Sequence, residues 1–569
     1  MLNKIQGYLQ QRNIDALYIP KADRFQGEYI QPCDEKLHFV SGFSGSAGYA
    51  LITKNMGILS ADSRYTLQAE QEVDQDEWQI VNSADMRLED LLTKHKIESM
   101  TVDPWLITVK QVSALKQHVA VLPFEEDPFK QWWHDRPSPS KEKAFLLDVI
   151  YSGVAAKDKI TQITSMVQQP LLISLCEDVC WLLNIRGKDV PYTPVLHSMA
   201  ILDVSGHVHV FLDLDKVTLE VADNFKGIAT FYSEDTLVDF IKNIPVLRYD
   251  PAQTPYAMMI NRTAHYDSAQ ENPITLLKAK KNKTEQDGMR NAHVKDGVAV
   301  INTLYWLDTH PQKEKLTELD VVDFILSERK KQALFQMPSF STIAGSGPNG
   351  QSAHYKPAQK TNRCLKKEDT LLLLDSGGQY LDGTTDITRT IALDQLTDAQ
   401  KMDYTLVLKG HIALSTCVFP KGTTGAHLDI LARQFLWQHG KDYGHGTGHG
   451  VGHFLSVHEG PQRISKFGFN TPLEPGMVVS NEPGYYHGTH YGIRHESLEL
   501  VVESAHKGFY QFETLTKVHF DITAIDFNLL TPDEKNWLHH YHHNVLKSVL
   551  GRLTPEVQTW MEAYISIKT

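Results

Sequence analysis

Hydrophobic and polar positions along the chain follow two alternating patterns. Short apolar runs typical of buried strands occur at 16–19 and 48–52, and the segments around them have helical spacing. The first residues, 1–10, have the pattern of an amphipathic helix. Helices that alternate with short strands predict an α/β domain in this part of the chain.

A second α/β pattern follows a proline- and serine-rich connection at 135–141. It predicts a helix near 158–166, a strand at 171–174 and an apolar segment at 181–183. The first domain has a comparable order, because its first strand is followed by the segment 37–43. The two patterns therefore predict a duplicated module.

The rest of the chain begins with helical periodicity at 284–306 and continues as a glycine- and histidine-rich region to Val502. The lysine-rich stretch Lys278–Lys283 is expected to be a solvated connection between domains. In the tail, Thr531 marks a helix start, and histidines crowd 539–543. No carboxylates stand at matching spacing, so these histidines favour a partly exposed helix at a domain or subunit contact over a metal site.

Length and composition limit the class of protein. A chain of 569 residues is several times larger than an ordinary domain and predicts three or four cores. Its 41% hydrophobic and 22% charged residues are typical of globular proteins, and no apolar run approaches the ~20 residues that span a bilayer. The net charge of −13 disfavours nucleic acid as the main partner. The N-terminal segment lacks the features of a secretory signal, so we expect a cytoplasmic protein.

The cysteines point to the same compartment. Five of them form an odd, sparse set, which suits reduced thiols in a cytosol better than a disulfide framework. Cys176 and Cys180 invite a metal interpretation, but no second pair of cysteines or histidines stands at ligand spacing. We therefore expect these two to be buried small side chains.

Four carboxylates stand beside predicted strands. The apolar strand 370–374 leads into Asp375, and a glycine-containing turn returns the chain to Asp386. These two side chains meet if their strands pair antiparallel in a suitable register, although each alone is equally compatible with a turn residue. Further along, strands lie directly beside Glu482 and Glu496.

The segment 443–453 places His445 and His449 four residues apart among glycines. So much glycine makes a poor helix, which excludes the helical His-Glu-x-x-His zinc motif. The glycines predict close approach of the backbone to a ligand. The apolar run 454–457 predicts a strand, on which His458 would face away from His449 unless the chain bends.

Four acidic groups and one imidazole in one pocket would repel one another unless cations were present. A pair of divalent ions meets that need, and an oxygen-rich ligand set with one nitrogen suits manganese, cobalt or zinc. Two such ions ~3.5–4 Å apart hold a bridging water, lower its pKa and polarise a carbonyl. The constellation therefore predicts a hydrolase.

These motifs resemble those of the pita-bread metallopeptidases, the family that includes methionine aminopeptidase, prolidase, creatinase and Xaa-Pro aminopeptidase. Five segments look like the Xaa-Pro aminopeptidase branch: 375–390, 445–452, 457–461, 482–486 and 492–494. Three segments outside them are similar to its large three-domain, cytosolic form: 41–48, 184–187 and the region of Tyr541. The resemblance covers nearly the whole chain.

The resemblance implies two divalent ions per subunit, with manganese as the first expectation and cobalt or zinc as alternatives. It implies five ligands: Asp375, Asp386, His449, Glu482 and Glu496. Asp386 and Glu496 would bridge the ions. Glu482 would also handle the proton taken from the bridging water.

The resemblance also implies residues that bind substrate without holding metal. His354, His445 and His458 would hydrogen-bond the substrate and the oxyanion of the tetrahedral intermediate. Tyr486 and Arg494 would lie beside the pocket for the proline ring. Alternatives stay open, because His354 also suits a loop cap, His445 an orienting role and Arg494 a pair with a ligand carboxylate.

Three positions need separate comment. Arg64 matches an arginine of the N-terminal domain that reaches the substrate in the three-domain form, but a surface salt bridge explains it almost as well. His453 stands where the family pattern has a small residue, and His495 where it has an aliphatic one. Neither replaces a ligand, so they bear on the pH optimum rather than on the reaction.

We therefore expect an α/β and α+β multidomain chain. It would contain two related creatinase-like N-terminal domains, a pita-bread catalytic domain and a tail that supports a homodimer, at 1–150, 151–280, 281–505 and 506–569. The implied activity is that of a metal-dependent aminopeptidase, which removes the first residue from peptides whose second residue is proline. Such a proline lacks an amide proton, so a pocket shaped for its ring selects it.

Three other functions compete with this one. A prolidase would cut only Xaa-Pro dipeptides, and the second module and the long tail favour the aminopeptidase over it. A binding protein that keeps the fold without metals is disfavoured, because all five ligand positions are filled. A creatinase-like amidine hydrolase would not need the five ligands.

Overall fold

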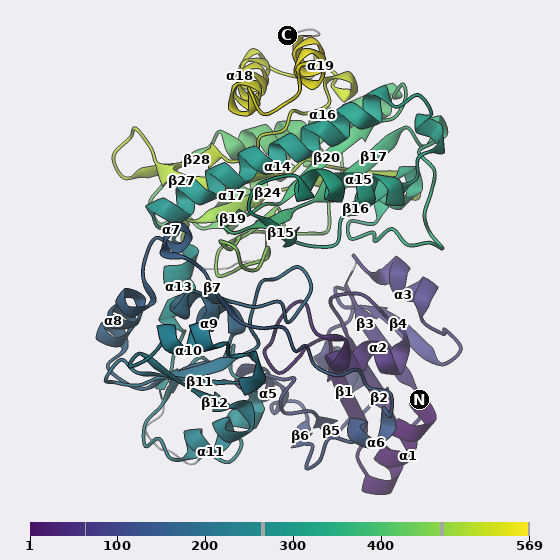
Figure 1. The fold of residues 1–569 in the computed structure, drawn as a ribbon. Coiled ribbons are helices and arrows are strands. Elements are labelled where there is room, and N and C mark those ends of the chain that lie inside the picture. The colour runs from purple at the N-terminus through teal and green to yellow at the C-terminus, as the bar shows by residue number, and fades with distance from the viewer. Residues whose placement is uncertain (63, 263–267, 467–470, 567–569) are drawn as a thin grey trace. The chain divides into compact units, whose positions relative to one another are not determined.

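The computed structural model describes all residues except 63, 263–267, 467–470 and 567–569. The chain divides into two compact units, which we describe separately (Figure 1). The N-terminal unit consists of Met1–Val149 and Val154–Ile274, and the C-terminal unit of Ile150–Gly153 and Thr275–Thr569. None of the described helices combines the length and the apolar character needed to span a bilayer.

The first half of the N-terminal unit is built on a six-stranded sheet of order β4-β3-β2-β1-β5-β6. Its strands are β1 (Ala16–Pro20), β2 (Tyr49–Thr53), β3 (Gly57–Ala61), β4 (Trp78–Asn82), β5 (Ser99–Val102) and β6 (Ala120–Pro123). Its helices are α1 (Leu2–Arg12), α2 (Lys36–Ser41), α3 (Thr66–Glu72), α4 (Leu88–Lys94), α5 (Val109–Leu115) and α6 (Phe129–Trp132). The predicted amphipathic first helix is confirmed, because α1 buries Ile5 and Leu9 in one apolar cluster with Leu17 and Ile19 of β1.

The second half contains another six-stranded sheet, of order β12-β11-β10-β8-β13-β14. Its strands are β8 (Leu171–Ile173), β10 (Met199–Leu202), β11 (Val208–Leu212), β12 (Ala229–Ser233), β13 (Arg248–Tyr249) and β14 (Ser268–Ala269). The main helices are α8 (Ala156–Val167), α9 (Cys176–Leu183), α10 (Leu219–Asn224) and α11 (Leu237–Lys242). Cys176 and Cys180 are buried on α9, as expected for small core side chains.

The duplicated module is confirmed by the strand pairing. In the first sheet β1 pairs antiparallel with β2 and parallel with β5, and in the second β8 pairs antiparallel with β10 and parallel with β13. The outer pairs, β3 with β4 and β11 with β12, are parallel in both. The expected α/β fold of this region therefore holds, with one topology used twice.

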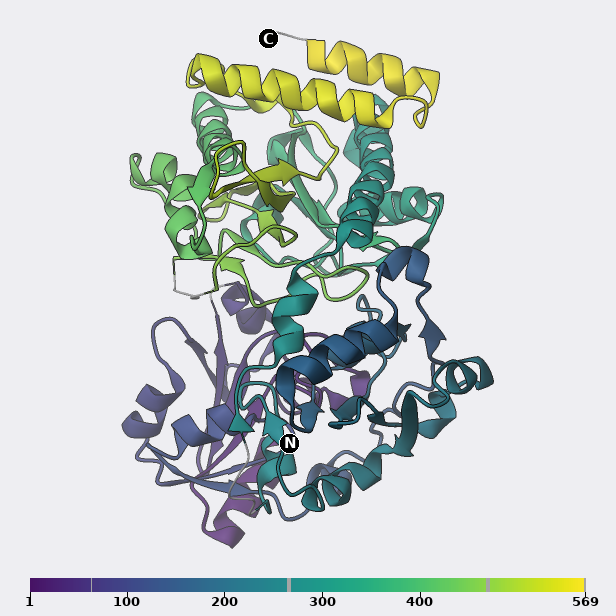
Figure 2. The same ribbon diagram turned by 90° about the vertical axis from the view of Figure 1, so that its left-hand side faces the viewer.

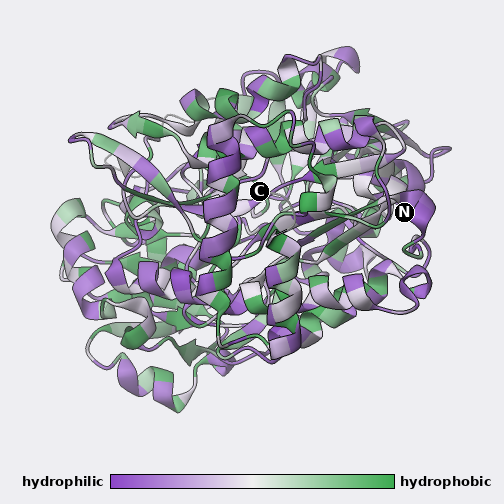
Figure 3. Ribbon diagram, turned by 90° about the horizontal axis from the view of Figure 1, so that it is seen from above, coloured by the Kyte–Doolittle hydropathy of each residue, from purple (hydrophilic) through white to green (hydrophobic). Residues whose placement is uncertain are grey.

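The C-terminal unit combines long helices with several small sheets. Its helices are α14 (Lys283–Thr309), α15 (Glu318–Lys330), α16 (Asp398–Ser415), α17 (Gly425–Trp437), α18 (Pro532–Val549) and α19 (Pro555–Ser566). Its strands are β15 (Phe335–Pro338), β16 (Ile343–Ser346), β17 (Leu371–Ser376), β18 (Gly378–Tyr380), β19 (Gly383–Thr384), β20 (Ile387–Ala392), β21 (Val418–Pro420), β22 (Gly448–His449), β23 (Arg463–Ile464), β24 (Val478–Asn481), β25 (Gly484–His487), β26 (Tyr491–Arg494), β27 (Ser497–Glu503) and β28 (Phe509–Thr514). The sheets have the orders β15-β18-β19, β16-β17-β20, β21-β28-β27-β24, β22-β23 and β25-β26. Helices carry both hydrophobic and hydrophilic residues along their length (Figure 3), as expected for helices with one buried side.

The tail forms the last two helices. Figure 2 shows α18 and α19 lying side by side next to α14, which both contact. On α18, Tyr541 and His542 are buried, whereas His540 and His543 are exposed. The predicted partly exposed helix is thus confirmed. Its role as a subunit contact stays a prediction.

The expectation for Lys278–Lys283 is wrong for two of its lysines. Lys278 and Lys281 are buried, and their ammonium nitrogens lie 3.2 and 3.4 Å from the carboxylate of Glu459. A run of lysines predicts solvation only when no carboxylate meets it inside the fold. Here the partner lies far along the chain, where composition gives no sign of it.

Candidate metal centre and active site

The first two carboxylates lie on a pair of antiparallel strands, as the sequence required. Strand β17 (Leu371–Ser376) pairs with β20 (Ile387–Ala392), and Asp375 stands opposite Thr388. Asp386 immediately precedes β20. The short strands β18 (Gly378–Tyr380) and β19 (Gly383–Thr384) form the connection. Both carboxylates are buried inside the C-terminal unit.

The other two carboxylates are presented by an equivalent arrangement. Strand β24 (Val478–Asn481) pairs antiparallel with β27 (Ser497–Glu503). Glu482 directly follows β24, and Glu496 directly precedes β27. The hairpin β25 (Gly484–His487) and β26 (Tyr491–Arg494) lies between them in sequence. Each pair of strands therefore delivers two acidic side chains at its end.

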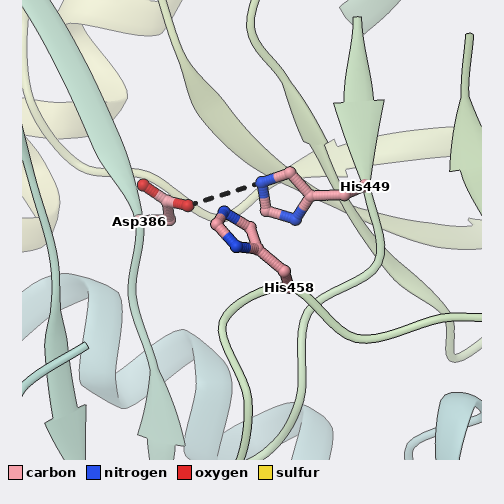
Figure 4. A group of neighbouring side chains, drawn as sticks. All are labelled: Asp386, His449 and His458. Carbon is pink, nitrogen blue, oxygen red and sulfur yellow. Dashed lines mark ion pairs between the residues drawn. The ribbon is translucent and has the colours of Figure 1, made fainter. Parts of the chain in front are cut away.

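The structure brings all five predicted ligands together. One ligand atom each from Asp375, Asp386 and Glu496 lies within 4.8 Å of the others, and the same holds for His449, Glu482 and Glu496. Asp386, His449 and His458 form a third such group (Figure 4). Nε2 of His449 lies 3.6 Å from Oδ2 of Asp386 and 3.4 Å from Oε1 of Glu482.

The charges in this cluster need compensation. Burial and the neighbouring Asp375 raise the pKa of Asp386 well above its usual range, and burial and Asp386 do the same to the pKa of Glu496. Burial, with a contribution from Asp375, raises the pKa of Glu482 to about 7. Oδ1 of Asp375 is buried without a hydrogen-bond partner. Cations bound among these oxygens would relieve both the repulsion and the missing bond.

His449 is held in a form suited to metal binding. It lies on β22 (Gly448–His449), and its Nδ1 contacts the Gly450 carbonyl oxygen at 3.0 Å. Nδ1–H donates to that carbonyl, which leaves the lone pair of Nε2 directed at the carboxylates. Burial lowers the pKa of His449 well below its usual value, so the ring is neutral. The donor set of four carboxylates and one neutral imidazole fits two divalent cations.

Two glycines of the histidine segment, Gly448 and Gly450, let protein backbones approach closely, while the expected approach of a ligand to this segment stays a prediction. A Cβ on Gly448 would lie 1.9 Å from the carbonyl oxygen of Ser480, and one on Gly450 would lie 2.0 Å from that of Glu459. Close approach of these backbones places His449 beside the end of β24. The glycines therefore serve to build the ligand cluster.

The predicted strand at 454–457 is wrong, and the difference explains the position of His458. This segment is an irregular loop with Phe454 at φ +48°. Gly452 donates its N–H to the Ser456 carbonyl at 2.9 Å, and Glu459 donates to that of Gly450 at 2.8 Å. The loop turns the chain back, so the rings of His458 and His449 lie 4.4 Å apart. Its apolar side chains are all buried, which made the run look like a core strand.

Arg494 pairs with a predicted ligand, one of the alternatives that the sequence left open. Its Nη2 donates to Oδ2 of Asp375 at 2.5 Å, and its Nη1 donates to the Tyr486 hydroxyl at 2.7 Å. That hydroxyl also lies 2.8 Å from Nε2 of His445. Arg494, Tyr486 and His445 thus form a continuous chain of hydrogen bonds along one side of the carboxylate cluster.

Two further predicted residues lie outside this series of hydrogen bonds. His354 is half-buried in the turn after the helical segment Gly347–Gln351. The backbone of that segment packs against β26, because a Cβ on Gly492 would lie 1.8 Å from the Gly350 carbonyl oxygen. Arg64 belongs to the N-terminal unit, where its guanidinium donates to both carboxylate oxygens of Asp62 at 2.9 and 2.6 Å. The roles expected for both in substrate binding stay predictions.

Two residues of the site were missed in the sequence. Thr388 donates its hydroxyl to Oε2 of Glu496 at 2.8 Å and accepts from Nε of Arg494 at 3.1 Å. Ser480 donates to Oε1 of Glu482 at 3.2 Å and accepts the N–H of His449 at 2.9 Å. Thr388 follows Asp386 by two positions, and Ser480 precedes Glu482 by two. Residues two apart in an extended segment share a face, so this spacing could have indicated both.

The two histidines that depart from the family pattern are both buried. His453 lies against α14, because a Cβ on Gly288 would be 3.1 Å from its Nε2. His495 contacts the Tyr404 carbonyl oxygen at 3.3 Å, and its ring lies edge-on to that of Tyr404. Burial lowers the pKa of His495 well below its usual value. His495 therefore stays neutral at physiological pH.

Family models match nearly the whole length of the chain in four parts. Residues 287–503 match metallopeptidase family M24, and 508–566 match the C-terminal region of peptidase M24. Residues 1–127 and 135–285 each match a creatinase/prolidase N-terminal domain.

Individual relatives agree with these matches. Aminopeptidase P1 of Lotus japonicus is 36% identical over 93% of this chain and 93% of its own length. A Neurospora crassa protein named "Probable Xaa-Pro aminopeptidase P" is 38% identical over 97% of this chain and 86% of its own. A similar solved structure is that of X-prolyl aminopeptidase from Caenorhabditis elegans, described as a cytosolic enzyme with a di-nuclear active site. It superposes on this chain with a TM-score of 0.92 at 32% identity, over 97% of this chain and 95% of that one.

These relatives cover 93% or more of the chain, and the clustered carboxylates and histidine lie within the region that matches family M24. The chain therefore belongs to metallopeptidase family M24, in its group of Xaa-Pro aminopeptidases.

Proposed function

We propose that this protein hydrolyses the bond between the first residue of a peptide and a proline at the second position, at the cluster of Asp375, Asp386, His449, Glu482 and Glu496. The observation that carries the proposal is that these five donors lie in overlapping groups of neighbouring ligand atoms, with a buried carboxylate oxygen of Asp375 left unbonded. Two divalent cations fit this donor set, and we expect manganese, with cobalt or zinc as alternatives.

When bound, two such ions lower the pKa of a shared water and polarise the scissile carbonyl. The protein's own groups then complete the reaction. Glu482, whose Oε1 accepts from Ser480, takes the proton of the attacking water and passes it to the leaving proline nitrogen. His458, exposed beside His449, donates a hydrogen bond to the developing oxyanion.

Several polar groups bind and orient the peptide in this proposal. His445 is held by the Tyr486 hydroxyl, which Arg494 in turn fixes against Asp375. The fixed ring edge and hydroxyl form one wall for the proline ring. His354 contributes a further hydrogen bond to substrate in this proposal, and the role expected for Arg64 in substrate binding stays a prediction. Side chains that hydrogen bonds already hold in place lose little further freedom when the proline ring binds against them, which favours binding of the ring.

The remaining expectations follow the same relatives. The division at 1–150, 151–280, 281–505 and 506–569 is supported by the four matched regions. A cytoplasmic location is supported by the nematode enzyme, which is described as cytosolic. We also propose a homodimer in which the tail, and α18 in particular, supports the contact.

A peptide panel tests the substrate class. Purified protein with Mn²⁺ is expected to cleave Xaa-Pro-Xaa tripeptides and longer peptides, and to cleave Xaa-Ala-Xaa at least about 100-fold less well, because the pocket is shaped for the ring. The measurement is kcat/KM for each peptide by release of the first amino acid. Cleavage confined to Xaa-Pro dipeptides would instead identify a prolidase, and equal rates for proline and alanine would contradict a proline pocket.

A further inference from the structure

Arg389 on β20 is a buried cation whose donors are all used. It is among the largest fully buried side chains of the protein. Its Nε donates to the His519 carbonyl at 3.1 Å, and its Nη1 donates to the carbonyls of Thr388 and Glu496 at 3.0 and 2.6 Å. Its Nη2 donates to the Val518 carbonyl at 2.7 Å and to the Tyr541 hydroxyl at 2.9 Å. These are five bonds for the five N–H groups of a guanidinium.

The partners of Arg389 are unusual for a buried arginine. In the described part of the chain no carboxylate oxygen pairs with it at ion-pair distance. Its guanidinium carbon lies 4.1 Å from the centre of the Phe520 ring. Buried cations normally need a paired charge. Carbonyl dipoles, one aromatic face and the acidic ligand cluster nearby take that place here.

Two of these carbonyls belong to Glu496 and to Thr388, whose side chain bonds the Glu496 carboxylate. Arg389 binds the backbone oxygen of Glu496 itself and that of Thr388. The hydroxyl of Thr388 bonds the Glu496 carboxylate, and the N–H of Glu496 donates to the Thr388 carbonyl at 3.1 Å. Arg389 therefore fixes both the backbone of Glu496 and the residue that orients its carboxylate.

The remaining contacts of Arg389 reach the tail. Tyr541 on α18 accepts from Arg389 and donates toward the Val518 carbonyl at 2.8 Å. Its ring stacks on that of Trp537, with centroids 5.1 Å apart. The hydroxyl of Tyr541 is thus the one side-chain oxygen among the five acceptors of Arg389.

We propose that Arg389 is a positioning residue for Glu496, and that the C-terminal helix α18 supports the metal centre through the Tyr541 hydroxyl. This proposal rests on the proposed ligand role of Glu496. The path has two steps: Tyr541 fixes the guanidinium plane, and the guanidinium fixes the Glu496 backbone and Thr388. The tail would then support the metal site in addition to packing against α14.

Tyr541→Phe is the variant that tests the link. Arg389→Ala would leave several buried carbonyls without a donor and destabilise the fold, whereas Tyr541→Phe keeps the stacked ring and removes one oxygen. Tyr564→Phe on α19 is the matched control, because its hydroxyl donates to Asp521 at 2.5 Å and does not bind Arg389. Metal-free protein of each form is titrated with Mn²⁺ alone, and the Kd is measured by equilibrium dialysis beside the melting temperature.

We expect Tyr541→Phe to weaken Mn²⁺ binding about tenfold, near the lower end of the effect of outer partners of a metal ligand. Higher Mn²⁺ should restore turnover. Tyr564→Phe should lower the melting temperature without changing the Kd. An unchanged Kd in Tyr541→Phe, or an equal loss in Tyr564→Phe, would overturn the link. Failure of the wild-type protein to bind two ions would instead overturn the proposed function.

Discussion

Asp386→Ala is expected to lose both metal ions, whereas Asp375→Ala loses mainly one. The resemblance makes Asp386 a ligand of both ions, and its place in one donor group with Asp375 and Glu496 and in another with His449 is compatible with that role. Removing the carboxylate shared by both ions takes a ligand from each, so hydrolysis of Xaa-Pro-Xaa peptides should fall below detection in Asp386→Ala. The measurement is metal content per subunit after dialysis in limiting Mn²⁺, determined by elemental analysis.

Asp394→Ala is the control for this comparison, because Asp394 is an exposed carboxylate just beyond the same strand β20. It should retain two ions and full activity. Unchanged metal content in Asp386→Ala would contradict its assignment as a bridging ligand. Equal loss of both ions in the two variants would show that Asp375 also serves both positions.

His458→Ala is expected to lose turnover by about 10²–10³, the cost of one hydrogen-bond donor to an oxyanion. Two ions per subunit should remain, and the melting temperature should be normal because the ring of His458 is exposed. The measurements are kcat, metal content and thermal unfolding, with the exposed His506→Ala as control.

The structure makes the outcome of this test informative. His458 lies close enough to Asp386 and His449 to share an ion with them. Loss of metal in His458→Ala would therefore show that it is a sixth ligand. Near-normal turnover would show that it is a packing residue with no part in the reaction.

Much of the fold can be predicted from the sequence because the local residue patterns agree with the positions of these residues in the folded protein. The apolar strand before Asp375 and the helix at 284–306 are present as β17 and α14, and the duplicated module emerged as two sheets of one topology. The five expected ligands could be named because the motifs around them resemble those of a known family. Such features depend on nearby residues, which the sequence displays directly.

The errors arose where contacts that the local residue pattern does not show decide the structure. Lys278 and Lys281 look solvated in sequence but meet Glu459 inside the fold. The run 454–457 has the composition of a strand, but its loop is closed by hydrogen bonds of Gly450 and Gly452. Arg389 looks like an ordinary strand residue, and only the packed structure shows it bonded to the backbone of Glu496.

We propose that this cluster of carboxylates and histidine is a two-ion site that cleaves the bond before proline. The most direct test of this claim is a titration of chelator-stripped protein with Mn²⁺, in which bound metal and hydrolysis of an Xaa-Pro-Xaa peptide are followed together. We predict no hydrolysis in stripped protein and a return of full activity as binding approaches two ions per subunit. Full activity of the metal-free protein would contradict the claim.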